Sequence, residues 1–215
     1  MLLAGGSGLV GTELAALLRK LKPAPKLHQL VRRVPPQAAS AAPSVVWHEV
    51  DFGALPALPR AEWAFCCLGT TIRQAGSQQA FAAVDRHAVL AFAKAARGAG
   101  VSRFAVVSAL GANARSSTFY NRVKGEMEAA VAEVGFDVLV IVRPSLLVGD
   151  RAALGQPARF GERLALRATA PIAGLLPARW RPVPAQAVAR GMLDALRQAD
   201  PGVRIVESAE LQRLR

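Results

Sequence analysis

The sequence is poor in the residues that build disulfides and metal sites. Its 215 residues include two cysteines and three histidines. Cys66 and Cys67 are adjacent, which suits them poorly for an ordinary disulfide, and no histidine is near enough in the sequence to complete a zinc site. The histidines at positions 28, 48 and 87 form no ligand pattern. We therefore expect no bound metal, and we interpret the two thiols as small core residues in a reducing compartment.

Long hydrophobic runs are also missing. The longest apolar stretch near the C-terminus, residues 168–178, is too short to span a bilayer and contains two prolines. Met1 leads almost directly into a glycine-rich turn, without the charged and apolar regions of a signal peptide. These absences predict a cytoplasmic protein without a transmembrane segment.

Acidic residues are few, 15 against 27 basic residues, and the formal net charge of +12 would suit a nucleic-acid-binding protein. The basic residues are scattered, however, and they form no basic arm. The sequence also has no zinc-finger spacing and no RNA-binding aromatic signature. Arginine greatly outnumbers lysine and alanine is abundant, which indicates a compositional bias. We therefore expect no specific binding to nucleic acid.

The composition is that of a globular domain, because 52% of the residues are hydrophobic and 20% are charged. Short apolar runs alternate with helical patterns, which predicts an α/β fold with a doubly wound parallel sheet. The first predicted strand ends at residue 4, and the others cover 26–33, 44–50, 62–68, 103–107, 137–142 and 203–206. The predicted helices cover 12–20, 78–97, 119–134, 160–168 and 185–196. We expect one domain over residues 1–215, with its core at about 1–144 and a small C-terminal, substrate-side lobe at 145–215.

The first eleven residues, MLLAGGSGLVG, combine the end of a buried strand with a glycine-rich turn before a helix. Gly5, Gly8 and Gly11 have the three-residue spacing that suits a dinucleotide phosphate: a tight turn, close approach of the pyrophosphate, and packing of helix on strand. The helix N-terminus would add free N–H groups and about half a positive charge.

Other glycine motifs fit less well. A P-loop would need a lysine where Thr12 stands, and a nucleophile elbow centred on Ser7 would need a glycine in place of Leu9. Gly6, Gly8 and Gly11 also satisfy the common G-x-G-x-x-G fingerprint. Glycine-rich turns also occur for purely steric reasons.

The second predicted strand ends in Arg32 and Arg33. In dinucleotide folds an acidic residue at this place binds the ribose of NAD, whereas arginine suits the 2′-phosphate of NADP. The alternative is that both arginines are solvated at a strand end. Asp51 follows the third strand, where it would cap a turn or accept a hydrogen bond from the adenine amino group. Leu68, Gly69 and Thr70 follow the fourth strand, where a parallel sheet binds its ligand.

Three residues point to carbonyl reduction. Ser108 ends the fifth strand, Tyr120 comes twelve residues later, and Lys124 lies one helical turn beyond it on the same face. Hydride transfer to a carbonyl leaves an alkoxide, so a proton donor is needed, and a nearby ammonium makes a phenol a better acid. Ser108 would orient the substrate oxygen and stabilise its developing charge. A Tyr–Lys pair at this spacing also occurs on solvated helices. Here the pair follows the glycine-rich turn and the strand-end serine along the chain, and this order favours the catalytic interpretation.

The sequence resembles an atypical short-chain dehydrogenase/reductase, and within that superfamily the Tat-interacting-protein-like oxidoreductases. The segments that carry the resemblance are GGSGLVG, LVRR, VDF, FCCLGTT, VDRHAVL, YNRVKGEME and RPSLLVGDR. The resemblance implies a Rossmann-like fold that binds NADPH, with Tyr120 as the catalytic acid and Lys124 as its helper. It further implies phosphate contacts from Ser7, Gly8, Leu9 and Val10, 2′-phosphate contacts from Arg32 and Arg33, contacts from Leu68 and Gly69, and a border to the nicotinamide at Pro144 to Leu147.

We therefore expect an NADPH-dependent reductase that acts on a small carbonyl substrate. The alternative is a non-catalytic NADPH-binding protein that senses redox state or assists assembly. We expect a monomer or a weak homodimer. Beyond position 150, Phe160, Leu164, Leu175, Leu176 and Trp180 are interpreted either as an apolar substrate pocket or as ordinary core.

Overall fold

The structure, a computed structural model, describes residues 1–36, 38, 41–149 and 177–214. The predicted helix at 160–168 and four of the five proposed pocket residues lie outside the described residues. Trp180, the fifth, is 53% exposed, so it is not part of a buried core.

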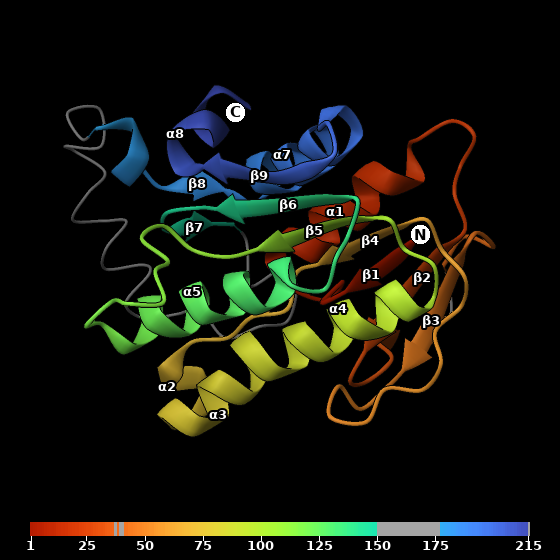
Figure 1. Ribbon diagram of the computed structural model, residues 1–215. Helices are drawn as coiled ribbons and strands as arrows, with labels where there is room; N and C mark the ends of the chain where they lie inside the picture. Colours follow the sequence, from red (N-terminus) through yellow and green to blue (C-terminus); the bar gives the residue numbers. More distant parts are fainter. Residues whose placement is uncertain (37, 39–40, 150–176, 215) are drawn as a thin grey trace.

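Seven parallel strands form one sheet in the order β3-β2-β1-β4-β5-β6-β9 (Figure 1). The strands are β1 (Leu2–Ala4), β2 (Leu27–Val31), β3 (Val45–Glu49), β4 (Trp63–Cys66), β5 (Arg103–Val107), β6 (Val138–Arg143) and β9 (Gly202–Glu207). The order reverses between β1 and β4, and ligands of such sheets bind at this switch point, beyond the carboxyl ends of the strands. A separate pair of short strands, β7 (Leu147–Val148) and β8 (Val183–Pro184), follows the end of β6. The predicted α/β, Rossmann-like fold is confirmed.

Helices cover both faces of this sheet (Figure 1). Helices α1 (Leu9–Arg19) and α7 (Ala185–Gln198) pack on one face, and α4 (Val89–Gly98) and α5 (Phe119–Ala132) pack on the other. The shorter helices are α2 (Ile72–Ala75), α3 (Gln78–Ala82), η2 (Ala83–Ala88), η4 (Ala178–Trp180), α8 (Ser208–Leu211) and η5 (Gln212–Leu214). The single helix predicted for 78–97 is thus made of α3, a π-helical turn and α4.

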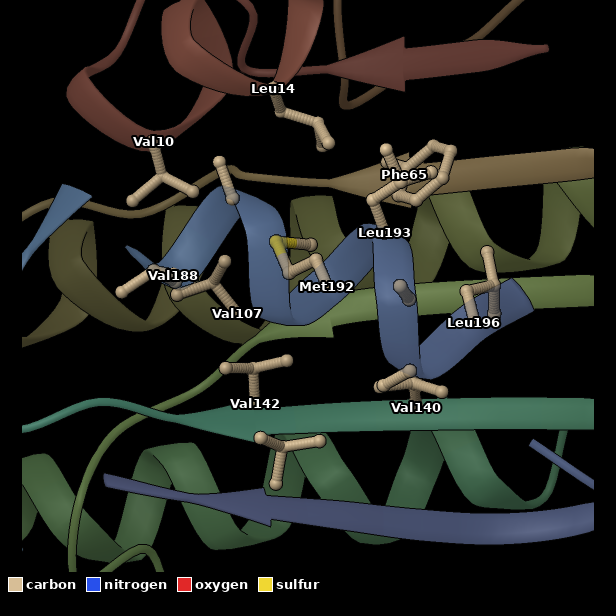
Figure 2. Close-up of a cluster of buried hydrophobic side chains, with 14 of the residues drawn as sticks. Val10, Leu14, Phe65, Val107, Val140, Val142, Val188, Met192, Leu193 and Leu196 are labelled. Carbon is tan, nitrogen blue, oxygen red and sulfur yellow. The ribbon is translucent and has the colours of Figure 1, made fainter. Parts of the chain in front are cut away.

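The core explains why the central strands are largely apolar. In β6, Val140 and Val142 face α7, whereas Leu139 and Ile141 face the other side, so both faces of the strand are buried. Figure 2 shows α7 lying on the sheet, and its labelled side chains, Val188, Met192, Leu193 and Leu196, pack with Val10, Leu14, Phe65, Val107, Val140 and Val142.

The C-terminal segment therefore contributes to the same core. Strand β9 pairs along its full length with β6, and α7 packs against α1 as well as the sheet. Residues 183–207 thus complete the Rossmann-like unit, which extends the core beyond the expected limit near residue 144. The substrate-side lobe stays a prediction, because residues 150–176 lie outside the described part of the chain.

Candidate functional site

The glycine-rich turn occupies the switch point of the sheet, between the end of β1 and the start of α1. Gly5 has a φ of +79°, and a Cβ there would lie 2.6 Å from the carbonyl carbon of Cys67. A Cβ on Gly11 would lie 2.1 Å from the carbonyl oxygen of Gly5. Both distances are too short for any side chain, so the turn requires glycine at these two positions.

The N-terminus of α1 fits a phosphate. Gly8 is the N-cap residue and has no side chain with which to cap the helix, and the first turn contains no acidic residue that would repel an anion. Its first N–H groups therefore point out of the helix toward the carboxyl edge of the sheet. Ser7 is exposed at this place, while the side chains of Leu9 and Val10 are buried in the core and leave only their backbone to face a ligand.

Arg32 and Arg33 directly follow β2 and are exposed. Neither guanidinium is paired with a carboxylate among the described residues. The loop that carries them is tied to the end of β3, because the backbone N–H of Val34 donates to Glu49 Oε2 at 3.0 Å. Asp51 accepts a hydrogen bond from the backbone N–H of Gly53 at 2.8 Å, which is the turn-capping contact expected of it. Its contact with a nucleotide stays a prediction.

Ser108 lies where β5 ends, and it is 4% exposed. Its backbone N–H donates to the carbonyl of Val142, which fixes the residue to β6. Its hydroxyl, in contrast, has no hydrogen-bond partner within the part of the chain that the structure describes. A buried hydroxyl without a partner is unfavourable unless a ligand or water completes it, so this oxygen is suited to meet a substrate.

Helix α5 carries Tyr120 in its first turn and Lys124 one turn later. The ring of Tyr120 is half-buried and packs against that of Phe81, with the ring centres 5.3 Å apart. Lys124 is 3% exposed, and its Nζ lies 2.7 Å from Asp85 Oδ1. Burial by itself disfavours the ammonium, but the Asp85 carboxylate, and after it Tyr120, more than offset that effect. The pKa of Lys124 is therefore raised above its ordinary value.

Asp85 is the residue that sequence reasoning missed. It is 1% exposed and lies in η2, and its Oδ2 accepts a hydrogen bond from the backbone N–H of Thr70 at 2.8 Å. A signal was present, because an acidic residue interrupts the apolar stripe between Phe81 and Ala88 of the predicted helix. Buried carboxylates in such a stripe need a partner, and here the partner is Lys124.

The other predicted residues lie along the same carboxyl edge of the sheet. Leu68, Gly69 and Thr70 follow β4, with Thr70 held by Asp85 as described. Pro144 is buried directly after β6, and its carbonyl accepts a hydrogen bond from the backbone N–H of Leu110 at 2.8 Å. Leu147 is half-buried in β7. The roles of these residues toward a cofactor stay predictions.

Comparison with known proteins identifies relatives of this chain. Protein HTATIP2 of Rattus norvegicus is 42% identical over 154 residues, which cover 68% of this chain and 60% of that protein. The mitochondrial protein fmp52 of Emericella nidulans is 33% identical over 162 residues, covering 69% of this chain and 67% of that protein. The chain belongs to the HTATIP2 and FMP52 family of atypical short-chain dehydrogenases/reductases. The matched part spans less than two thirds of HTATIP2. No family model matches the sequence.

Solved structures show the same fold as this member of the HTATIP2 and FMP52 family. MoeE5 in complex with UDP-glucose and NAD superimposes with a TM-score of 0.71 at 17% identity, over 96% of this chain and 75% of that one. The ADP-L-glycero-D-manno-heptose-6-epimerase of Helicobacter pylori gives 0.69 at 17% identity with the same coverage. The similarity in sequence to HTATIP2 and fmp52 confirms the resemblance to the Tat-interacting-protein-like proteins that the sequence predicts.

Two further observations concern the described residues as a whole. No described helix is both long enough and apolar enough to cross a membrane. Within the described ranges, no three His, Cys, Asp or Glu residues gather in the way that a metal ion would require.

Proposed function

We propose that this protein is an NADPH-dependent reductase of small carbonyl compounds. The observation that carries the proposal is the buried hydroxyl of Ser108 at the end of β5, which has no hydrogen-bond partner among the described residues. It lies on the same sheet edge as the Tyr120–Lys124 pair of α5. A serine, a tyrosine and a lysine are the groups that transfer of a proton to a reduced carbonyl requires.

NADPH, when bound, supplies the hydride that adds to the carbonyl carbon. The π electrons of the C=O bond move onto oxygen, and Tyr120 donates its phenolic proton to that oxygen to give the alcohol. Ser108 donates a hydrogen bond to the same oxygen as negative charge develops. Lys124 stabilises the resulting phenolate, with which its ammonium interacts favourably. Solvent then restores the phenolic proton.

The glycine-rich turn and the N-terminus of α1, where the N-cap residue is Gly8, support a dinucleotide at the switch point of the sheet. Preference for NADPH over NADH is assigned to Arg32 and Arg33, because these two exposed guanidinium groups suit a 2′-phosphate. A cytoplasmic location and a monomeric or weakly dimeric state belong to the same proposal.

The proposal is tested first by titration with NADPH and NADH, with the fluorescence of the three tryptophans as the signal that reports binding. We expect NADPH to bind at least about tenfold more tightly than NADH, since charge-assisted contacts to a phosphate contribute about 1.5–3 kcal/mol. The Arg32→Ala/Arg33→Ala variant should lose this preference. Arg60→Ala is the matched control, because Arg60 is exposed before β4, at the opposite edge of the sheet. Failure of both nucleotides to bind would remove the basis of the proposal.

The catalytic role is tested with Tyr120→Phe on a carbonyl substrate identified by NADPH consumption. We expect this variant to bind NADPH as the wild type does and to lose at least about 100-fold in turnover. Undiminished turnover would show that Tyr120 is not the proton donor. NADPH binding without turnover of any carbonyl compound would favour the alternative of a redox sensor.

A further inference from the structure

Asp85 joins two parts of the site through one buried carboxylate. Oδ2 accepts the backbone N–H of Thr70, in the loop after β4, and Oδ1 lies 2.7 Å from Nζ of Lys124 on α5. The side chains of both charged residues are at most 4% exposed. Such a pair must be specifically arranged, because an unpaired buried charge is strongly unfavourable.

The π-helical turn explains how Asp85 reaches this position. Helix η2 (Ala83–Ala88) interrupts the path from α3 to α4, and π-turns frequently accompany functional sites. The same turn is tied to α5 a second time, on its outer side, by Arg86 and Glu126 at 2.5 Å. That outer pair is partly exposed and does not involve Lys124, whereas the inner pair is closed to solvent. Both ion pairs therefore join η2 to α5, but only the inner pair includes Lys124.

We propose that Asp85 is a positioning residue that fixes the Lys124 ammonium beside Tyr120 and offsets its charge, so that Tyr120 retains the proton it donates to the substrate. This inference rests on the proposed function. An ammonium alone would strongly favour the phenolate before a substrate arrives. With a carboxylate at 2.7 Å the same ammonium favours the phenolate less, while it still interacts favourably with the phenolate that forms when the proton is transferred.

The charge balance involves few other groups among the described residues. Tyr120 faces Lys124 from the same helix, Asp85 faces it from η2, and the thiol of Cys66 faces it from β4. Burial raises the pKa of Cys66 to about 12, with a smaller contribution from Asp85, so the thiol stays neutral at physiological pH. Among the described groups that face Lys124, Asp85 is thus the one that carries a compensating negative charge.

The experiment uses the fact that Tyr120 is the only tyrosine of the chain. Ultraviolet absorbance of the phenolate during a pH titration of the whole protein therefore reports this one side chain, and Tyr120→Phe gives the blank. In Asp85→Asn the amide oxygen can still accept the N–H of Thr70, but the negative charge is gone. We expect the midpoint of phenolate formation to fall by about one pH unit.

Two further variants separate charge from structure. Asp85→Asn/Lys124→Met removes both charges together, and we expect its midpoint to return close to that of the wild type. It also serves where the single variant folds poorly, because no charge is left buried without a partner. Glu126→Gln breaks the outer pair between the same two elements and should leave the midpoint unchanged.

An unchanged midpoint in Asp85→Asn would overturn the inference, and so would equal shifts in Asp85→Asn and Glu126→Gln, which would indicate general loosening of η2. The titration needs neither nucleotide nor substrate. If the wild-type protein binds no NADPH, the proposed function fails. That outcome is distinguishable from failure of the inference about Asp85, which the titration alone decides.

Discussion

The buried thiol of Cys66 leads to a specific prediction for stability at alkaline pH. Cys66 is 0% exposed in β4, where it pairs with Ala4 of β1 and Val106 of β5. Burial raises the pKa of this thiol from its ordinary value of 9.0 to about 12, while a hydrogen bond from the backbone of Leu68 and the charge of Lys124 only partly oppose the effect. The folded protein therefore keeps a proton that the unfolded chain releases.

The sign and size of the effect follow from linkage. The thiol contributes fully to stability below its unfolded pKa of 9.0, and the contribution is lost as the pH rises from there toward the folded pKa of about 12. The slope is about 1.4 kcal/mol per pH unit, which amounts to about 2 kcal/mol between pH 9 and about pH 10.5. The raised pKa of Lys124 acts in the same direction, but only above its ordinary value of 10.5. The pKa of Cys67 is also raised by burial, so its thiol adds to the slope in the same window.

The assay is urea unfolding, followed by circular dichroism, at a series of pH values from about 7 to about 10.5. Cys66→Ala should lower the free energy of unfolding at neutral pH by about 1 kcal/mol through lost packing, and it should make the alkaline decline shallower by the slope of one thiol. Val106→Ala is the matched control, because it removes buried volume beside Cys66 without removing a titrating group. An equal decline in wild type and Cys66→Ala would refute the reasoning.

Two further predictions concern packing and charge in the core. Met192 is 0% exposed on α7, with its sulfur 3.9 Å from that of Cys67, so Met192→Ala should lower the free energy of unfolding by about 2–5 kcal/mol in urea titrations; a loss below about 1 kcal/mol would show that α7 contributes little to the core. Arg143 holds the carboxylate of Glu128, which is 6% exposed, through Nε at 3.0 Å and Nη2 at 2.5 Å. Arg143→Met should therefore lower the thermal unfolding midpoint, at a cost of about 3–5 kcal/mol, and Arg143→Met/Glu128→Gln should recover part of that loss; equal midpoints for the two variants would argue against a buried unpaired charge.

Much of the fold could be predicted because the central strands are buried on both faces. The predicted strand at 103–107 coincides with β5, and the predicted strands at 26–33 and 137–142 differ from β2 and β6 by no more than two residues at either end. Alternation of such runs with helices then leaves a parallel, doubly wound sheet as the natural arrangement. The relation of Tyr120 to Lys124 was equally accessible, because helical periodicity alone places them on one face.

The role of the C-terminal segment was harder to predict. The exposed side chains Val203 and Ile205 make β9 look unlike the central strands, and nothing local indicates that it pairs with β6. Pairing of an edge strand depends on which neighbours the tertiary fold brings to it. Ionic contacts such as that between Arg143 and Glu128 were equally hard to predict, because they join residues from different elements.

Asp85 illustrates most clearly what a linear pattern leaves out. Helical periodicity places residues at about 100° intervals, but a π-turn inserts an extra residue and changes the direction in which the following side chains point. The carboxylate that results is shared by the loop after β4 and by α5, so the loop expected to border the cofactor and the helix that carries the proton donor meet at one buried group. Because that group is enclosed and doubly paired, displacement of either element would leave a charge buried without its partner. The relative position of loop and helix is therefore set by electrostatics as firmly as by packing.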